Sequence, residues 1–417
     1  MDNLTLIPVI MAGAFALGVA EKKMVQKNID KIPLRIVVNG IRGKSTVTRL
    51  ITGILKEAGY KVVGKTTGSA ARMIYWDSDE EEVIYRRPEG PNITEQKSVV
   101  KKAAKKGADA LVSECMAVNP DYQKALQEEF VQANMAVIVN VLEDHMDVMG
   151  PTLDQIAEAF TNTIPYNGHL IVSNDDYVNY YKRIAKRRRT RVFVADDALI
   201  SEAFLKKFKY MVFPQNASLA LAVADALGID RQTAFKGMLN ANADPGAAEV
   251  WSIPSFGKNI FFINGFAVND ATSTLSMLER FNALGYNTDN ATVIMNCRPD
   301  RVDRSQQFAD DVLPYMNVKR IITMGQITQP IVLAHEKGSF IAPEFIDMEN
   351  ASIPDIMAQL RRQESNSVIF SVGNIHGDGE PLLEALEKVS EHADLYNDSK
   401  TTWTTGKNTT SAKFQED

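Results

Sequence analysis

Cysteines are scarce in this sequence, and basic residues are not in excess. Only two cysteines occur among 417 residues, Cys115 and Cys297, and both fall inside apolar segments expected to be core strands. So few cysteines exclude a scaffold held by disulfides and favour a reducing, cytosolic setting for the main body. The formal net charge of −6 argues against a nucleic-acid-binding protein, so no nucleic acid is expected among the partners.

Long apolar runs are absent as well, apart from one at the N-terminus. Leu4 to Ala20 contains no charged residue and is at the short limit for a membrane helix. Four lysines follow it: Lys22, Lys23, Lys27 and Lys31. Because lysines flank the cytoplasmic end of membrane segments, we interpret residues 1–22 as an apolar helix that anchors a cytoplasmic catalytic body to the cell membrane. The alternative is a buried helix packed on that body.

The most informative stretch runs from Leu34 to Ala58. Leu34 to Asn39 is a short β-branched run, which is typical of a buried strand. Val47 to Ala58 repeats apolar residues on one helical face and stops before Gly59. A glycine-bounded loop lies between them: Gly40, Ile41, Arg42, Gly43, Lys44, Ser45 and Thr46. Strand, loop and helix therefore follow in the order of a phosphate-binding P-loop.

A P-loop aims backbone N–H groups and a helix N-terminus at phosphate oxygens. Lys44 would reach the terminal phosphates, and the Ser45 hydroxyl would ligate Mg²⁺. The general pattern has a further glycine where Val38 stands here, so an ordinary strand-to-helix turn is the alternative. The flanking strand and helix favour a nucleotide site.

Strands and helices alternate through the first half of the chain. Strands are expected at Lys61–Lys65, Ala110–Ser113, Met135–Val141 and His169–Val172, and helices at Glu95–Lys106, Tyr122–Phe130 and Leu153–Phe160. This alternation predicts an α/β fold with a doubly wound parallel sheet. Ligands of such sheets bind at the carboxyl ends of the strands.

Two polar residues follow strands at that same edge. Glu114 could complete a Mg²⁺ site with Ser45, since hard cations prefer oxygen ligands. His145 could ligate a second cation or orient a phosphate. The alternatives are a surface acid and a capping histidine. The loop from Thr66 to Ser69 could also line a phosphate site.

Two later segments of the sequence each fit more than one role. Seven of the ten residues from Lys182 to Arg191 are basic. Such a run fits either a solvated helix end or a surface that binds an anionic polymer or a membrane. Asn216 and Ser218 lie at the start of an alanine-rich helix. They could cap this helix and do nothing more, or they could also contact the nucleotide base.

The segment from Asn242 to Gly246 is the best domain boundary. Strands recur beyond it at Asn259–Ile263, Ala291–Asn296, Arg320–Met324 and Ser367–Val372, which predicts a smaller C-terminal α/β domain. The loop from Cys297 to Arg304 carries three arginines and suits anion binding. We expect an ATP-binding domain over 30–243, a second domain over 247–395 and a polar, disordered tail over 396–417.

From residue 22 to about residue 390 the sequence resembles the Mur ligase superfamily of ATP-dependent amide ligases. It is most similar to the PgsB/CapB-type subunits of poly-γ-glutamate (capsule) synthases. The short P-loop, Glu114, Asn140 with Asp144–Asp147, and Asn216 resemble the family's nucleotide and metal motifs. Asn269–Asp270 and Pro299–Arg304 resemble the motifs of its mobile domain.

The resemblance implies roles for named residues. It implies catalytic roles for Lys44, Glu114, His145, Arg301 and Arg304. It also implies nucleotide contacts for residues 40–46, Asn140, Asn216 and Asp270. The Mg²⁺ ligands that it implies are Ser45, Glu114 and His145.

Two departures from the family pattern matter. Too few residues precede the P-loop for the domain that holds a nucleotide-sugar in wall-building relatives. Many relatives also carry a carbamoylated lysine shortly after the histidine motif, yet no lysine occurs here between His145 and Lys182. A second metal site would have to be completed differently.

The implied activity is elongation of poly-γ-glutamate, with ATP and Mg²⁺ as cofactors. A chain-end carboxylate becomes an acyl phosphate, which the amine of glutamate attacks. The implied partners are glutamate, the polymer chain and membrane subunits of the synthase and export complex.

Three other activities remain as alternatives. A folylpolyglutamate synthase or another Mur-type ligase shares the chemistry. A P-loop NTPase could regulate a membrane complex, although the Asn-Lys-x-Asp order of GTPases is missing after the P-loop. A membrane-bound module without turnover would leave Glu114 and His145 unexplained.

Overall fold

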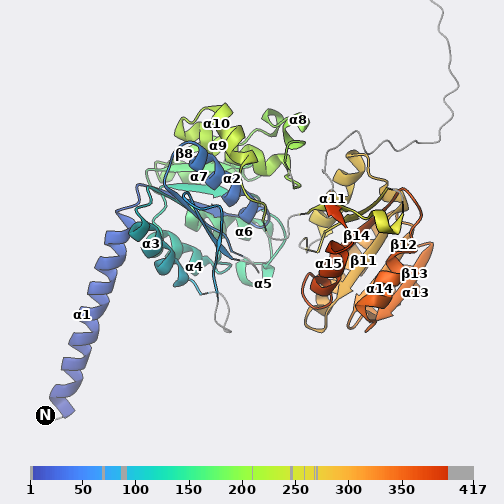
Figure 1. Ribbon diagram of the computed structural model, residues 1–417. Coiled ribbons are helices and arrows are strands. Elements are labelled where there is room, and N and C mark those ends of the chain that lie inside the picture. Colours follow the sequence, from blue (N-terminus) through green and yellow to red (C-terminus); the bar gives the residue numbers. More distant parts are fainter. Residues whose placement is uncertain are drawn as a thin grey trace, which may run out of the picture. The chain divides into compact units, whose positions relative to one another are not determined.

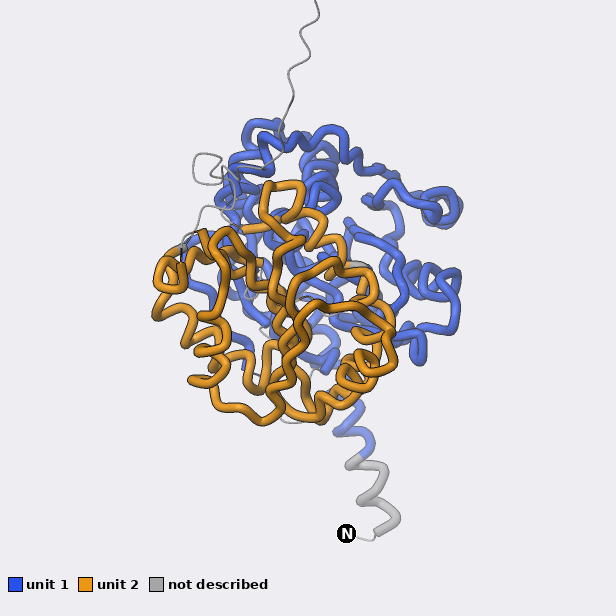
Figure 2. Tube along the Cα trace, turned by 90° about the vertical axis from the view of Figure 1, so that its right-hand side faces the viewer, with its two compact units in different colours: residues 1–208, 212–245 blue, residues 209–211, 246–417 orange. Residues whose placement is uncertain are grey.

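The chain divides into two compact units in the computed structural model. Unit 1 comprises residues 1–208 and 212–245, and unit 2 comprises residues 209–211 and 246–417 (Figure 2). The structure describes residues 3–67, 71–85, 92–208, 210–244, 248–257, 259–266, 268 and 271–392; for 3–10, 272 and 392 it describes the backbone alone. The predicted tail over 396–417 lies outside the described residues.

The described residues of unit 1 form an eight-stranded sheet in the order β4-β3-β2-β5-β1-β6-β7-β8. Its strands are β1 (Leu34–Asn39), β2 (Val62–Lys65), β3 (Arg72–Tyr75), β4 (Glu82–Val83), β5 (Ala110–Glu114), β6 (Met135–Ile138), β7 (His169–Val172) and β8 (Arg191–Val194). The six strands from β2 to β8 in that order are parallel, while β3 and β4 are added antiparallel. The expected parallel α/β sheet is therefore present.

Helices cover both faces of this sheet (Figure 1). The α-helices of unit 1 are α1 (Asn3–Ile29), α2 (Lys44–Glu57), α3 (Glu95–Lys106), α4 (Pro120–Ala125), α5 (Met146–Met149), α6 (Leu153–Phe160), α7 (Val178–Arg187), α8 (Glu202–Leu205), α9 (Pro214–Leu227) and α10 (Arg231–Leu239) within the described residues. Helix α2 packs against α9 and α10 on one face. On the other face, one apolar cluster joins α3 to β1, β2 and β5, and a second joins α6 and α7 to β6 and β7.

The bounds predicted from the sequence for β1, α3, α6 and β7 are confirmed. The predicted helix from Tyr122 to Phe130 is α4 followed by a π-helical turn, Leu126–Phe130. Strand β6 ends at Ile138, three residues before the predicted end at Val141. The strands β3, β4 and β8 were not predicted.

Helix α1 stands out from the rest of unit 1 (Figure 1). Only its end is anchored, because Ile29 and the following Ile32 are buried in the core beneath α3. Further out, Met11, Phe15 and Leu17 are 66%, 76% and 73% exposed.

Among the residues that the structure describes, no helix is both long and apolar enough to cross a membrane. The membrane helix predicted over residues 4–20 therefore has no support in the described part of the chain.

Unit 2 is built on a second, seven-stranded sheet in the order β13-β12-β11-β14-β10-β9-β15 within the described residues. Its strands are β9 (Val250–Ser252), β10 (Ile260–Ile263), β11 (Thr292–Cys297), β12 (Arg320–Gly325), β13 (Glu344–Glu349), β14 (Ser367–Gly373) and β15 (Glu391–His392). Its helices are α11 (Ala271–Ala283), α12 (Val302–Asp311), α13 (Gln329–Glu336), α14 (Ile353–Leu360) and α15 (Gly379–Glu387).

The strands from β13 to β10 in this second sheet are parallel, and β9 and β15 extend it antiparallel. Each of the four strands predicted for this half of the chain is present, shifted by at most one residue at either end. The strands β9, β13 and β15 were not predicted.

Candidate nucleotide and metal site

A cavity of about 220 Å³ opens at the carboxyl ends of β1 and β5 in unit 1. Its lining combines P-loop residues with the segments that follow β5 and β6. These residues are Asn39, Gly40, Ile41, Lys44, Thr67, Glu114, Cys115, Met116, Ala117, Val118, His145, Met149 and Phe160. The cavity therefore brings together three of the predicted catalytic residues, Lys44, Glu114 and His145.

Two glycines shape the loop at this cavity. Gly40 has φ of +132°, and a Cβ there would lie 3.0 Å from the backbone N of Val139. Gly43 has φ of +78°, and a Cβ there would lie 2.5 Å from Oδ1 of Asn216. Positive φ and close neighbours both require glycine. The loop thus turns sharply into α2, whose first residues are Lys44 and Ser45.

Lys44 holds its own loop together. Its Nζ donates hydrogen bonds to the backbone oxygens of Gly40, at 2.8 Å, and Ile41, at 2.9 Å. Burial lowers the pKa of the Lys44 ammonium, and the nearby carboxylate of Glu114 opposes that shift. The cation therefore lies at the loop where phosphate oxygens are expected.

Glu114 is the centre of the polar contacts in the cavity. The Ser45 hydroxyl donates to Oε2 of Glu114 at 2.9 Å, and the backbone N–H of Thr67 donates to the same oxygen at 2.7 Å. The Thr67 hydroxyl donates to the other carboxylate oxygen. Glu114 is only 3% exposed, so these three donors replace the water that burial removes.

The oxygens of Ser45 and Glu114 are of the kind that Mg²⁺ prefers. Magnesium is usually held by one or two carboxylates together with substrate phosphates rather than by a complete protein cage. Among the described residues, no three His, Cys, Asp or Glu side chains are grouped closely enough to hold a metal ion by themselves. The donor set fits an ion that shares its ligands with a phosphate.

Asn140 fixes the P-loop from the segment after β6. Its Oδ1 accepts hydrogen bonds from the N–H groups of Ile41, at 3.1 Å, and Arg42, at 3.0 Å, and its Nδ2 donates to the oxygen of Arg42. Asn140 thus positions the loop backbone. The sequence had predicted only a nucleotide contact for this residue.

His145 lines the cavity from an unusual backbone position. Its φ is +51°, and its N–H is bonded to Oδ1 of Asp144 at 2.9 Å. Asp144 also forms an ion pair with Arg42 of the P-loop at 3.0 Å. This pair ties the histidine segment to the phosphate loop.

Asn216 lies in the first turn of α9 and is largely buried against Gly43. The suggestion that Asn216 or Ser218 caps this helix is wrong, because α9 begins at Pro214 and its N-cap is Phe213. Ser218 instead donates to Oδ1 of Asp197 and to the oxygen of Gln215. Asn216 is therefore placed beside the P-loop by packing.

The other predicted site residues belong to unit 2. Arg301 is exposed at the end of the turn before α12. Arg304 lies on α12, and its Nη1 donates to Oδ1 of Asn374, which follows β14. Asp270 lies outside the described residues. The predicted contacts of Arg301, Arg304 and Asp270 with the nucleotide stay predictions.

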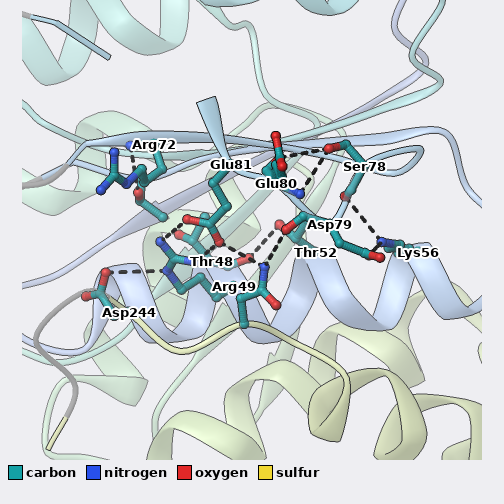
Figure 3. A network of polar contacts seen from close by, with 12 residues as sticks. Thr48, Arg49, Thr52, Lys56, Arg72, Ser78, Asp79, Glu80, Glu81 and Asp244 are labelled. Carbon is teal, nitrogen blue, oxygen red and sulfur yellow. Dashed lines mark hydrogen bonds and ion pairs between the residues drawn. The ribbon is translucent and has the colours of Figure 1, made fainter. Parts of the chain in front are cut away.

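One buried charge cluster in unit 1 was not predicted (Figure 3). Arg49 of α2 has a side chain only 1% exposed and makes two hydrogen bonds to the carboxylate of Glu81, one of them at 2.9 Å. Its Nε lies 3.4 Å from Oδ1 of Asp244. Asn242 also donates to Glu81, at 3.2 Å. The cluster joins the P-loop helix to the segment between β3 and β4, which carries Glu81, and to the end of unit 1.

The two halves of the chain match two family models. Residues 38–242 match the Mur ligase middle domain, and residues 250–389 match the poly-gamma-glutamate synthase CapB C-terminal domain. The fold is similar to the bifunctional folylpolyglutamate synthase/dihydrofolate synthase of Yersinia pestis, solved with AMPPNP and a Mn ion. That similarity has a TM-score of 0.65 at 13% identity, over 88% of this chain and 93% of that one.

Two relatives are much closer in sequence. The chain is 58% identical to PGA synthase CapB of Bacillus subtilis, over 92% of this chain and 98% of the relative. It is also 58% identical to the capsule biosynthesis protein CapB of Bacillus anthracis, over 88% of this chain and 80% of the relative. With this identity along nearly its whole length, the chain belongs to the CapB family of poly-γ-glutamate synthases within the Mur ligase fold.

Proposed function

We propose that this ATP-dependent amide ligase elongates poly-γ-glutamate through an acyl phosphate. An oxygen of the chain-end carboxylate bonds to the γ-phosphorus of ATP while the bond from that phosphorus to ADP breaks. The amino nitrogen of the incoming glutamate then bonds to the acyl carbon. The carbon–oxygen bond to phosphate breaks, and the nitrogen loses a proton. The products are ADP, phosphate and a polymer longer by one residue.

The observation that carries this proposal is the hydrogen bond between Ser45 and Glu114, directly after the glycine loop. A hydroxyl at the start of α2 and a buried carboxylate at the end of β5 meet directly after the glycine loop. This is the arrangement needed to hold a metal-bound triphosphate. A strand-to-helix turn without a nucleotide would give Glu114 no reason to be buried there.

Ser45 and Glu114 are the residues that would hold Mg²⁺, which neutralises charge on the phosphates when bound. Lys44 supplies a fixed positive charge beside the transferring phosphoryl group. Asn140 accepts hydrogen bonds from the N–H groups of Ile41 and Arg42 and so holds the loop in the shape from which it turns into α2. His145, which also lines the cavity, is proposed to support a second ion or the acyl phosphate.

The test is a ligation assay with the purified full-length chain, ATP, Mg²⁺ and glutamate with a short poly-γ-glutamate primer. ADP release and new amide bonds are followed together. We expect one amide for each ADP, and a folylpolyglutamate primer should give none. ADP release without amide formation would point instead to an NTPase that regulates a membrane complex.

A pair of lysines on α2 provides the matched variants for this assay. Lys44→Ala should abolish both ADP release and ligation while the protein stays folded. Lys56→Ala removes an exposed lysine of the same helix that pairs with Asp79 at 3.0 Å, and it should leave turnover unchanged. Near-normal ADP release by Lys44→Ala would remove the P-loop assignment.

The proposal also places the chain at the cell membrane, with its catalytic body on the cytoplasmic side, where ATP is available. The exposed apolar side chains of α1 support this location, because such a surface needs a lipid or protein cover. A polymer made inside the cell must leave it, so the membrane subunits of an export complex are the proposed partners.

Deleting residues 1–20 tests this location. The deletion should leave ATP turnover intact but move the protein from the membrane fraction to the supernatant when the partner subunits are co-expressed. A full-length chain found wholly in the supernatant under those conditions would contradict the proposed location.

A further inference from the structure

Exposed basic side chains gather where α7 ends and β8 begins. We call this group the basic edge: Lys182, Arg183, Lys186, Arg187, Arg189 and Arg191. None of the six forms an ion pair with a residue that the structure describes. The guanidinium groups of Arg183 and Arg191 lie over the rings of Tyr180 and Phe193, respectively. A surface with six positive charges that form no ion pair within the described residues needs an explanation in a chain of net charge −6.

Helix stability explains only part of this group. Lys186 and Arg187 lie in the last turn of α7, where positive charge favours the helix dipole. Arg188 has a structural role, because its Nη1 donates to the backbone oxygens of Thr161 and Ile164. The charges at positions 182, 183, 189 and 191 lie outside the last turn of α7, and of these Arg183 and Arg191 pack on aromatic rings.

The basic edge lies at the end of the sheet where the parallel strands begin. Strand β8 starts at Arg191, whose N–H donates to the oxygen of Gly168 just before β7. The N–H of His169 donates to Asn134, and Asn134 in turn donates to the oxygen of Pro33 just before β1. These contacts form one continuous border from the basic edge to the end of α1.

The end of α1 adds charge to the same border. Lys23, Lys27 and Lys31 are exposed and form no ion pair with a described residue, whereas Lys22 pairs with Glu129 at 3.4 Å. The exposed apolar residues Met11, Phe15 and Leu17 continue outward from there. One border of unit 1 therefore presents positive charge beside an apolar helix, the combination found at membrane surfaces.

We propose that the basic edge binds the anionic headgroups of a phospholipid surface and orients unit 1 on it. The nucleotide site follows the opposite ends of the strands, and β1 alone has six residues, which span about 20 Å at about 3.3 Å per residue. Unit 1 would then face the lipid with its basic edge and keep its nucleotide cavity turned away from it.

A polyanionic glutamate chain is the competing occupant. The reacting end of that chain must lie at the nucleotide cavity, which is at the opposite ends of the strands from the basic edge. A polymer also gives the apolar residues of α1 no cover, whereas a lipid surface covers both features. This inference rests on the proposed membrane location and is independent of the ligase reaction.

The test compares binding of the full-length chain to vesicles of phosphatidylcholine alone and of phosphatidylcholine with phosphatidylglycerol. Binding to neutral vesicles reports the apolar helix, and the additional binding to anionic vesicles reports the basic edge. The additional binding should fall as salt is raised. The variant with Lys182→Glu, Lys186→Glu and Arg187→Glu should lose it by at least about a hundredfold, since removing each basic charge costs roughly fivefold near such a surface and the new carboxylates are also repelled by it.

A matched control carries the same change in net charge elsewhere. Lys337→Glu, Arg362→Glu and Lys388→Glu alter exposed residues of unit 2 and should bind anionic vesicles within about twofold of the unaltered chain. ATP turnover of each variant, measured without vesicles, should be unchanged and shows that the protein is folded. If the glutamate triple variant does not fold, Lys182→Gln, Lys186→Gln and Arg187→Gln replace it.

Two outcomes would overturn the proposal. In the first, the triple variant binds anionic vesicles as tightly as the unaltered chain. In the second, the triple variant loses binding to free poly-γ-glutamate while its vesicle binding is kept, which would assign the basic edge to the polymer. Vesicle results do not depend on turnover, so they remain decisive even if the proposed ligase reaction fails.

Discussion

The Nε atom of Arg49 lies 3.4 Å from Oδ1 of Asp244, and Asp244 directly precedes residues 245–247, where the sequence passes from unit 1 to unit 2. Arg49 belongs to α2, the helix that starts at the P-loop (Figure 3). Burial acts to lower the pKa of Arg49, but the hydrogen bonds and charges of Glu81 and Asp244 outweigh it and raise this pKa. The helix that positions Lys44 is thereby tied to the end of unit 1 through a buried cation.

Removing this cation should destabilise unit 1 strongly. Arg49→Met leaves Glu81 and Asp244 without their counterion, and loss of one partner of a buried pair costs about 3–5 kcal/mol. Hydrogen exchange of the α2 amides measures the free energy of unfolding of this unit separately from unit 2. The control is Lys56→Met, which breaks an exposed pair on the same helix and should cost less than about 1 kcal/mol. A loss below about 1 kcal/mol for Arg49→Met would show that the cluster contributes little.

Asp244 should give stability a pH dependence of its own. Burial raises the pKa of Asp244 to about 6, with the nearby Glu114 and Glu81 acting in the same direction and Arg49 opposing it. Between about pH 4 and pH 6 the folded protein then holds a proton that the unfolded chain has released. The free energy of unfolding due to this group is therefore greatest below about pH 4 and falls as pH rises through 6.

The difference between the unaltered chain and Asp244→Asn isolates this group and its charged neighbours, because carboxyl groups that do not interact with Asp244 titrate alike in both. Urea unfolding at pH 4, 5, 6 and 7 should show the unaltered chain losing stability relative to the variant as pH rises. The difference should be constant above about pH 7. A relative gain with rising pH would mean that the ion pair with Arg49 dominates and depresses the pKa instead.

The contrast between the P-loop and this cluster shows what the sequence could predict. Strand β1, the glycine loop and α2 are local features, because each depends on neighbouring residues in the chain. The burial of Arg49 depends on Glu81 and Asp244, which are distant in sequence. Helical periodicity cannot place a charged residue in the core when its partners come from other elements.

Two smaller errors have similar causes. Strand β6 ends early because the chain after Ile138 turns to the P-loop, where Val139 donates to Asn39 and Asn140 holds the loop backbone. Strand β8 (Arg191–Val194) was missed because four residues at the edge of the sheet give a pattern too short to recognise. Thr67 was expected only as part of a small polar loop, and its two bonds to Glu114 could not be deduced from spacing.

Gly43 should be irreplaceable for nucleotide turnover. An alanine there combines a positive φ with a Cβ 2.5 Å from Oδ1 of Asn216. We expect Gly43→Ala to abolish ADP release, because either the loop or α9 must shift. Gly59 supplies the control at the other end of α2, since its φ is +85° but nothing lies within 4 Å of an added Cβ.

Gly59→Ala should therefore cost about 1–2 kcal/mol of stability while turnover stays normal. Adding Asn216→Ala to Gly43→Ala separates strain from collision, because it removes the colliding oxygen but leaves the positive φ. Normal turnover in Gly43→Ala alone would show that the loop does not need its observed shape.

Glu114 and His145 should differ in their effect on metal dependence. Glu114→Gln keeps the shape of the side chain but loses its charge, so the Mg²⁺ concentration for half-maximal ADP release should rise at least about tenfold, which corresponds to about 1.4 kcal/mol. His145→Ala should raise it less, because no described residue near it completes a metal site. Mn²⁺ binding followed by paramagnetic resonance gives a second readout without turnover. Unchanged metal dependence in Glu114→Gln would remove Glu114 from the metal site.

Arg301 and Arg304 should affect turnover more than nucleotide binding. We expect these arginines of unit 2 to reach the nucleotide or the acyl phosphate only when the units close on it, as lids do. Arg301→Ala and Arg304→Ala should then lower kcat at least about tenfold while changing the Kd for ATP by less than about threefold. Arg362→Ala, an exposed arginine of the same unit, is the control and should change neither.

The bond between Arg304 and Asn374 makes a purely structural role testable. Asn374→Ala removes this bond but keeps the positive charge, so it should preserve most of the turnover if the charge of Arg304 is what matters. Arg304→Lys should likewise recover part of the kcat lost in Arg304→Ala. If Asn374→Ala and Arg304→Ala instead lose the same activity, the arginine serves only to hold the segment after β14. An equal loss of kcat and of ATP affinity in Arg304→Ala would indicate a site that is assembled before the nucleotide binds.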